Sequence, residues 1–414
     1  MTGSQRTNKA PRQPKRRNEV PSSLSPPNPI LVSIEGNSTQ QHPQLQQEPR
    51  DGRSPGSRLW CPQSVSTPGA RTVDIPAFLT DIWYFALPSA TLKRGRMQAK
   101  TLLGQPVLFA RDNDGVAFAL RDICPHRGIP LSCGRFDGRE VECRYHGWRF
   151  DGGGGCTAIP SLVPDQDFDI SRIKVRRYPV VEAQGNLWIW MGNSAPQGEP
   201  AQMPDMDGRV PNLTEVMHFP CPVDHAVIGL MDPAHGPFVH QSWYWRSSRS
   251  IHEKAKAFGP APYGFAMKRH RPSSNSAAYK LLGGAPETEI TFRLPGIRTE
   301  HIAAGRHRIV NLTTVTPLDA NNTEVTNSFY WTLGWADLAK PILRRFVRRF
   351  LGQDRDVVVM QQKGLVHEPT LMLIKDADTQ ARWYHQLKNE YQRAQEEGRD
   401  FVNPVKDTIL RWRS

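Results

Sequence analysis

The pattern of apolar and polar positions divides the chain into three parts. In the first, residues 1–72, Pro, Ser, Gln, Asn and Arg dominate, and the few apolar positions show no period. Such a composition buries too little surface to offset the entropy of ordering the backbone. We therefore expect a disordered basic leader over residues 1–72, with ordered structure beginning at about residue 73.

The second part, residues 73–195, consists of short apolar runs separated by turn residues. Residues 106–110 and 116–120 flank an Asp-Asn-Asp-Gly turn, and residues 180–181 and 187–190 flank a Gln-Gly-Asn turn. Short apolar runs joined by such turns are typical of β-hairpins. The pattern therefore predicts an all-β domain over residues 73–195.

The third part, residues 196–414, mixes strand and helix patterns after a connection rich in Pro and Gly. The predicted strands are residues 287–294, 307–317 and 324–333, and the predicted helices are residues 225–240, 338–352, 354–364 and 378–397. Strands of this kind with helices laid against them form an α+β domain. The expected fold class is thus α+β, an all-β domain followed by an α+β domain with an antiparallel sheet.

The formal net charge of +13 over 414 residues raises nucleic-acid binding as a possibility. The positive charge is spread widely, however, and one dense cluster, residues 15–17, lies in the expected leader. A second cluster, Arg344, Arg345, Arg348 and Arg349, repeats at i, i+4 as on one face of a helix. That face is either simply solvated or a docking patch for an acidic electron donor, and we expect no nucleic-acid partner.

Six cysteines are few for this length, and no apolar run approaches the roughly 20 residues that a membrane helix needs. The N-terminus also lacks a charged segment followed by an apolar one, which a secretory signal requires. The sequence therefore predicts a cytoplasmic protein without a membrane span, in which cysteines serve metal binding or burial.

Four residues of metal-binding types, Cys124, His126, Cys143 and His146, form the motif C-x-H-x16-C-x2-H. Two Cys thiolates can hold one iron of a [2Fe–2S] cluster while two His hold the other. The same residue types also bind zinc, but zinc fingers usually pair Cys with Cys and His with His. Because each half of this motif mixes one Cys with one His, we predict a [2Fe–2S] cluster.

A second motif, D-x2-H-x4-H, is formed by Asp232, His235 and His240. Two His and one carboxylate make the facial triad that holds Fe(II) with open positions. Asp354 is the best candidate for the carboxylate, and Asp356 is the alternative. Positions i and i+5 lie ~140° apart around a regular helix, so a break at Gly236-Pro237 would have to turn both imidazoles to one side.

Ordinary explanations for this second motif remain open. Asp232 followed by Pro233 is also a plain helix start, with Asp as N-cap and Pro at the first position. His235 and His240 could be packed histidines, and both candidate acids could be solvated residues in a first helical turn. Its position after the cluster motif favours the iron interpretation.

Residues 80–395 together resemble the catalytic (α) subunit of the Rieske non-heme iron oxygenases, the aromatic ring-hydroxylating oxygenase family. The Trp-Tyr-Phe-Ala-Leu-Pro run at 83–88 is similar to the monooxygenase and demethylase branch, and residues 232–240 are similar to the pheophorbide a oxygenase type. The resemblance implies a Rieske domain at 73–195 and a helix-grip-like catalytic domain at 196–414.

The resemblance also implies cofactors, partners and one further role. It implies a [2Fe–2S] cluster, Fe(II), O2, and NAD(P)H electrons delivered by a separate ferredoxin or flavin reductase. It implies a homotrimer in which Asp232 links the iron site to the cluster ligand His146 of a neighbouring subunit. Ile129 and Tyr145 stand where high-potential Rieske proteins have a disulfide, and no hydroxyl side chain follows His146 within residues 147–150, which predicts a low-potential cluster.

The expected function is the hydroxylation, dihydroxylation or oxidative dealkylation of an apolar, aromatic or polycyclic substrate. The alternative is an electron-transfer or scaffold protein with an intact cluster and an inactive mononuclear site. Aromatic residues near the second motif and on the predicted strands are candidates for lining the pocket or for plain core packing: Phe238, Trp243, Trp245, Phe329 and Trp331. The substrate itself, and the choice between mono- and dioxygenation, stay open.

Overall fold

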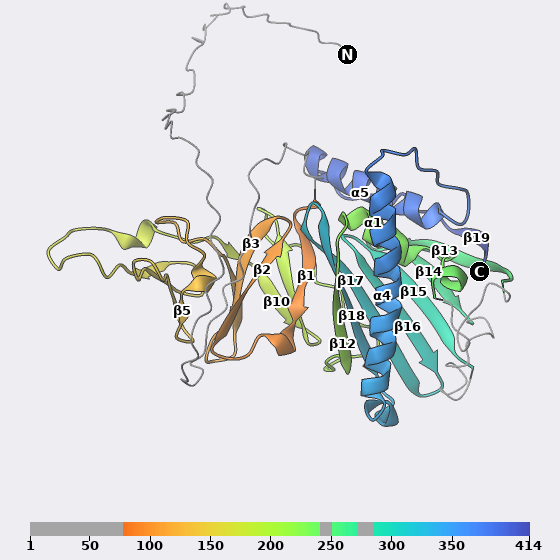
Figure 1. Ribbon diagram of the computed structural model, residues 1–414, viewed down its shortest axis with the longest axis horizontal. Coiled ribbons are helices and arrows are strands. Elements are labelled where there is room, and N and C mark those ends of the chain that lie inside the picture. Colours follow the sequence, from red (N-terminus) through yellow and green to blue (C-terminus); the bar gives the residue numbers. More distant parts are fainter. Residues whose placement is uncertain (1–77, 241–250, 272–284) are drawn as a thin grey trace, which may run out of the picture. The chain divides into compact units, whose positions relative to one another are not determined.

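The computed structural model describes residues 78–240, 251–271 and 285–414 (Figure 1). The expected leader over residues 1–72 and the pocket candidates Trp243 and Trp245 lie outside these residues. The domain boundaries at 73–195 and 196–414 remain predictions. The described strands pair antiparallel throughout, so the predicted fold class, α+β with an all-β N-terminal domain, is confirmed.

Three small sheets form the part of the fold that precedes residue 195. Their strand orders are β1-β11-β10, β2-β3-β4-β9 and β5-β6-β7-β8. The strands are β1 (Ile82–Pro88), β2 (Arg96–Leu102), β3 (Gln105–Arg111), β4 (Ala117–Arg121), β5 (Arg135–Phe136), β6 (Val141–Glu142), β7 (Arg149–Phe150), β8 (Cys156–Ala158), β9 (Arg177–Tyr178), β10 (Val180–Ala183) and β11 (Asn186–Met191). Short 3-10 turns at η1 (Ser89–Thr91), η2 (Leu131–Cys133) and η3 (Ile170–Arg172) connect them.

The hairpin of β10 and β11 follows directly from its sequence. Gln184 and Gly185 both adopt positive φ, 48° and 75°, as a two-residue type I′ turn requires. Every residue of β11 is buried, which is the arrangement expected of a short continuous apolar run. The hairpin predicted around these residues is therefore confirmed.

The rest of the chain builds one eight-stranded sheet of order β12-β18-β17-β16-β15-β14-β13-β19. Its strands are β12 (Leu213–Phe219), β13 (Glu253–Ala261), β14 (Gly264–His270), β15 (Glu287–Arg293), β16 (Ile297–Ala304), β17 (His307–Asp319), β18 (Asn322–Trp331) and β19 (Thr408–Arg413). The strands predicted at 287–294, 307–317 and 324–333 correspond to β15, β17 and β18.

The described helices are α1 (Val223–Met231), α2 (Gly236–Val239), α4 (Lys340–Leu365) and α5 (Thr379–Glu397), with a 3-10 turn at η5 (Gly334–Asp337). The helix predicted at 225–240 is wrong, because α1 ends at Met231 and α2 is separate. The break predicted between residues 352 and 354 is also wrong, because α4 continues through Gly352. Burial of Leu351 and Val358 against the core outweighs the roughly 1 kcal/mol that a helical glycine costs.

Helices α1 and α4 cover one face of the eight-stranded sheet (Figure 1). Helix α1 contacts β17, β18 and α4, and α4 contacts β12. The buried Glu215 of β12 forms ion pairs with Arg344 and Arg348 of α4, each at 2.6 Å. Arg344 and Arg348 therefore link α4 to the sheet, and all four arginines of the predicted cluster remain exposed. No helix among the described residues is long and apolar enough to cross a membrane.

Candidate functional site

The residues of the first motif lie in two loops with the same backbone geometry. In each loop the Cys N–H donates to the carbonyl five residues on, at 2.8 Å in both cases. The glycine four residues after each Cys, Gly128 or Gly147, donates back to the Cys carbonyl at 2.9 or 3.0 Å. Both glycines have positive φ, 73° and 70°, which a residue with a Cβ rarely adopts. The repeated turn therefore presents one Cys and one His from each loop in equivalent positions.

The two loops bring like residues together. Cys124 and Cys143 are buried and hydrogen-bonded to each other, and the ring centroids of His126 and His146 are 4.5 Å apart. Burial, together with the neighbouring Cys143 thiol, raises the pKa of Cys124 to about 11. Both thiols must lose a proton to bind iron, so a strongly positive group has to occupy this site. A pair of thiols beside a pair of imidazoles fits the ligand division of a Rieske cluster.

One zinc ion fits these four side chains less well. A single tetrahedral ion requires all of its donor atoms within one coordination sphere. Among the described residues, the one set of three or more metal-binding side chains whose donor atoms all lie within 4.8 Å is His235, His240 and Asp354. The four cluster residues are spaced more widely, as two iron ions require.

Aromatic rings enclose the two histidines of the first motif. Trp148 stacks on His126 at 4.6 Å and 6°, and Tyr145 packs on His146 at 3.9 Å. The side chain of His126 is exposed and that of His146 is half-buried. The thiols are thus buried while the imidazoles reach the surface.

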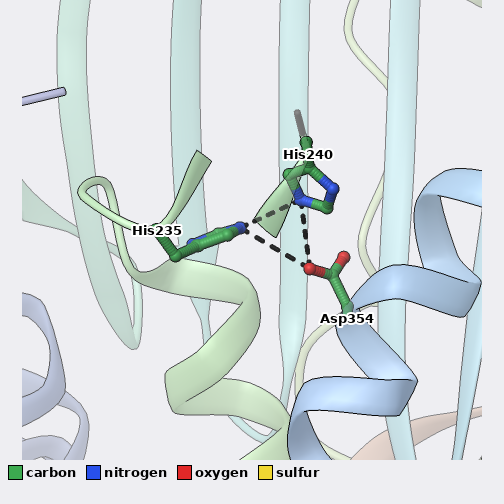
Figure 2. Close-up of side chains that lie close together, drawn as sticks. All are labelled: His235, His240 and Asp354. Atoms are coloured by element: carbon green, nitrogen blue, oxygen red, sulfur yellow. Dashed lines mark hydrogen bonds and ion pairs between the residues drawn. The ribbon is translucent and has the colours of Figure 1, made fainter. Parts of the chain in front are cut away.

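The second motif and Asp354 form a compact cluster (Figure 2). Nε2 of His235 lies 3.1 Å from Nε2 of His240, and Oδ1 of Asp354 lies 3.6 Å and 3.1 Å from these two nitrogens. Ligands at right angles around a metal at roughly 2.1 Å are about 3 Å apart, so the three atoms are spaced as a facial triad. Asp356, the alternative carboxylate, is exposed.

The backbone explains how two histidines five residues apart share one side. His235 precedes the four-residue helix α2 as its N-cap, and His240 follows it as its C-cap. The break that allows this lies at residues 232–234, and Gly236-Pro237 begins α2 instead of interrupting a helix. The ~140° separation of a regular helix therefore does not apply.

The hydrogen bonds of both imidazoles leave their Nε2 lone pairs facing each other. The backbone carbonyl of Asp232 accepts from Nδ1 of His235 at 2.7 Å, and Oε1 of Gln353 accepts from Nδ1 of His240 at 3.2 Å. A neutral imidazole that donates through Nδ1 has a lone pair at Nε2. Two lone pairs at 3.1 Å beside a carboxylate repel one another unless a cation lies between them. The donor set therefore fits Fe(II).

Asp232 lies beside this cluster and is partly open to the surface. Its Oδ1 accepts from the N–H of Ala234 at 2.7 Å, and its Oδ2 is 3.8 Å from Nδ1 of His235. Burial raises the pKa of Asp232, and the nearby Asp378 carboxylate adds to this effect. About a third of the side chain, 34%, remains exposed, so the carboxylate can meet a group outside the chain.

The remaining aromatic candidates differ in their surroundings. Phe238 is exposed, and Phe329 is half-buried on the sheet. Trp331 is buried in the main core and donates to Asp337 at 3.2 Å, so it packs as a core residue. Two neighbours of His240 were not predicted from the sequence: Gln353, and Phe350, whose ring stacks on the imidazole at 3.6 Å and 14°.

Comparison with known proteins adds independent information. Residues 82–179 match the family model described as Rieske [2Fe-2S] domain. The chain is 35% identical over 181 residues to chlorophyllide a oxygenase of Chlamydomonas reinhardtii, an alignment covering 42% of this chain and 26% of that protein. It is 36% identical over 169 residues to the oxygenase component of dicamba O-demethylase of Stenotrophomonas maltophilia, covering 40% and 48%. The chain thus spans about a quarter to a half of the length of these relatives.

Solved structures extend the likeness beyond the first domain. Apo dicamba monooxygenase superposes with a TM-score of 0.61 at 22% identity, over 78% of this chain and 99% of that chain. A caffeine-bound NdmA variant of Pseudomonas putida CBB5 superposes with a TM-score of 0.62 at 18% identity, over 76% and 92%.

Residues 82–179 match the Rieske [2Fe–2S] domain, and the described chain has the fold of dicamba monooxygenase and NdmA. The resemblance to Rieske non-heme iron oxygenases of the dicamba monooxygenase and chlorophyllide a oxygenase type is confirmed.

Proposed function

We propose that this protein is an oxygenase that couples a Rieske cluster to a mononuclear Fe(II) site. The observation that carries the proposal is the convergence of His235 Nε2, His240 Nε2 and Asp354 Oδ1 within 4.8 Å. A protein that only transfers electrons through its cluster needs no second set of converging metal ligands. Iron bound there would supply open coordination positions at which O2 reacts beside a substrate.

The side chains have distinct tasks in this proposal. Cys124, His126, Cys143 and His146 hold the [2Fe–2S] cluster, and His235, His240 and Asp354 hold Fe(II). The Asp232 carbonyl and the Gln353 amide fix the histidine tautomers by accepting from Nδ1. Electrons from NAD(P)H enter through a separate ferredoxin or flavin reductase.

Electron transfer between the two sites is proposed to cross a subunit interface in a homotrimer. Asp232 contacts the iron ligand His235 and keeps 34% of its side chain exposed. His146 is at the half-buried edge of the cluster loops. The backbone carbonyl of Asp232 accepts from His235, and its carboxylate is free to accept from a second imidazole. Asp232 would therefore link His235, through its carbonyl, to His146 of a neighbouring copy, through its carboxylate.

The reaction is proposed to be a hydroxylation, a dihydroxylation or an oxidative dealkylation. Relatives include a dicamba O-demethylase, a chlorophyllide a oxygenase and a 4beta-methylsterol monooxygenase, the last from Methylococcus capsulatus and 34% identical over 146 residues. These names span a small aromatic acid, a tetrapyrrole and a sterol. For this chain they support an apolar, aromatic or polycyclic substrate.

The proposal is tested with the full chain, loaded anaerobically with iron and reduced through a ferredoxin reductase system. We expect a Rieske EPR signal from the reduced protein, and mass spectrometry should detect ¹⁸O from ¹⁸O2 in a product of a panel of aryl ethers, sterols and tetrapyrroles. Asp354→Ala should keep the EPR signal and lose the product. A reduced, iron-loaded protein that forms no labelled product with any member of the panel would indicate an electron carrier instead.

A further inference from the structure

Five polar residues lie together on the face of the sheet that α1 and α4 cover. Cross-strand pairing aligns Asn327 of β18 with Thr313 of β17, and Thr313 with Arg298 of β16. In the adjacent row Asn311 of β17 is aligned with Glu300 of β16. We refer to Arg298, Glu300, Asn311, Thr313 and Asn327 as the polar patch.

The side of the sheet is fixed by residues in register with the patch. Glu215 is aligned with Asn327 and reaches α4 through its ion pairs with Arg344 and Arg348. Val315, two residues after Thr313, lies beside Gly296, and both approach Val227 of α1. Because side chains alternate along a strand, the patch shares this helix-covered face.

The candidate metal ligand of α4, Asp354, lies over the same face of the sheet. Asp354 belongs to the buried stripe of α4 with Val347, Leu351 and Val358. It follows Arg348, which is bound to Glu215, by six residues, or roughly 9 Å along a helix. The patch therefore begins beneath the helix that supplies the carboxylate of the cluster in Figure 2.

The hydrogen bonds within the patch are incomplete. The Thr313 hydroxyl donates to Oδ1 of Asn327 at 2.6 Å, and Arg298 donates one long bond of 3.3 Å to Glu300. Oδ1 of Asn311 is buried and has no partner within the part of the chain that the structure describes. Among the described residues no acceptor bonds to Nδ2 of Asn327, although the residue is only 6% exposed.

Unsatisfied polar atoms on an otherwise apolar face need a physical reason. Leaving a buried donor or acceptor unpaired costs about 1–3 kcal/mol, so such groups usually have partners. Ligand sites are characteristically apolar with a few converging polar groups. In the patch, the buried atom without a partner among the described residues is the Oδ1 acceptor of Asn311, and the N–H groups of Arg298, Asn311 and Asn327 that make no hydrogen bond outnumber it. Free N–H donors require acceptor oxygens.

We infer that the polar patch binds the substrate through acceptor oxygens, a carboxylate or a carbonyl, carried on an otherwise apolar ring system. The inference rests on the proposed oxygenase function and names its substrate class. It sharpens the expectation of an apolar substrate, because a pure hydrocarbon would leave the Asn327 and Arg298 donors unpaired. Glu300 offsets the charge of Arg298, so both charged and neutral acceptors have to be tested.

The test measures binding by calorimetry under anaerobic conditions, with cluster and iron bound. The probes are meta-methoxybenzoate, meta-methoxyacetophenone and meta-methoxytoluene, together with the matching naphthalene series. We expect the benzoate, the acetophenone or both to bind at least about tenfold more tightly than the methyl-substituted ether of the same series, which shares the methoxy group but lacks the carboxylate or carbonyl. Tighter binding of the benzoate identifies a carboxylate, and tighter binding of the ketone identifies a carbonyl.

Variants assign the effect to the patch. Asn327→Leu and Arg298→Met should remove the preference, whereas Thr326→Val should keep it. Thr326 lies on the opposite side of the same strand, and its buried hydroxyl has no partner among the described residues. Cluster absorbance confirms folding of each variant. Equal binding or no binding across both series in the wild type, or an unchanged preference in both patch variants, overturns the inference. Binding is measured without turnover, so the outcome of this test does not depend on whether the oxygenase assay detects a product.

Discussion

Oε1 of Gln353 lies 3.2 Å from Nδ1 of His240, while Oδ1 of Asp354, the next residue, lies 3.1 Å from Nε2 of the same ring. Two consecutive residues of α4 therefore act on opposite edges of one imidazole. The face of the ring is covered by Phe350, one helical turn earlier, at 3.6 Å. Helix α4 thus sets the position, the orientation and the tautomer of His240.

Replacing Gln353 should weaken metal binding without removing a metal ligand. Gln353→Leu deletes the acceptor at Nδ1, so the imidazole loses its fixed tautomer, and losses at such positions are typically 10–100-fold in metal affinity. Gln353→Glu keeps an acceptor and should restore the affinity. Co(II) titration followed by d–d absorbance measures both values in the same protein. Equal affinities of the Leu variant and the wild type would rule out a positioning role for Gln353.

The two candidate carboxylates of α4 should differ sharply. Asp354→Ala removes a buried ligand atom and should abolish stoichiometric iron at the mononuclear site, whereas Asp356→Ala changes only an exposed side chain. Iron content after chelation and reloading measures the difference, and the Rieske absorbance serves as the internal reference for folding. Loss of iron in Asp356→Ala, with iron retained in Asp354→Ala, would contradict the assignment.

The first motif could be predicted because its information is local. Cys124, His126 and their partners lie in two short loops whose residue types and glycines are visible in the sequence. The second motif was harder, since a continuous helix through His235 and His240 would separate the two side chains. The break at residues 232–234 that brings them together depends on packing of α1 against the sheet and α4.

Other contributors to the site carry no pattern in the sequence. Gln353 is one amide in a polar helix. It acquires a role only because the fold brings His240 within hydrogen-bond distance of it. The polar patch is set by the register of β16, β17 and β18, so Arg298 and Asn327 become neighbours through two strand pairings. Single-sequence reasoning does not determine register between strands that are far apart in the chain.

The two cluster loops should tolerate alanine differently at equivalent glycines. Gly128 and Gly147 both have φ near 70°, so alanine costs each about 1 kcal/mol in backbone strain. A Cβ at Gly128 meets no atom of the described residues within 4 Å, whereas one at Gly147 lies 3.1 Å from Cγ of Pro160. Gly147→Ala should therefore lower the temperature at which the protein loses its cluster more than Gly128→Ala does. Visible circular dichroism during heating measures both, and a reversed order would show that the Pro160 contact is relieved without cost.

The free energy of unfolding should fall in acid, in part because protonation of Asp224, at the start of α1, removes its ion pair with Lys388. Burial alone would raise the pKa of Asp224, but Lys388, at 2.6 and 2.8 Å, and the Tyr384 hydroxyl, at 2.6 Å, outweigh it and lower the pKa below its ordinary value. A lowered folded-state pKa means that the unfolded chain takes up the proton first as the pH falls. The contribution is therefore complete above the ordinary value of 3.8 and is lost as the pH falls through the folded-state pKa.

Asp224→Asn should accordingly melt at a lower temperature than the wild type near neutral pH, and the difference should shrink toward acid. Melting temperatures recorded from roughly pH 7 down to roughly pH 2 measure this convergence. Glu396→Gln, at an exposed position of the same helix as Lys388, is a matched control that should run parallel to the wild type. A pH-independent difference between wild type and Asp224→Asn would show that the ion pair with Lys388 does not stabilise the packing of α1 on α5.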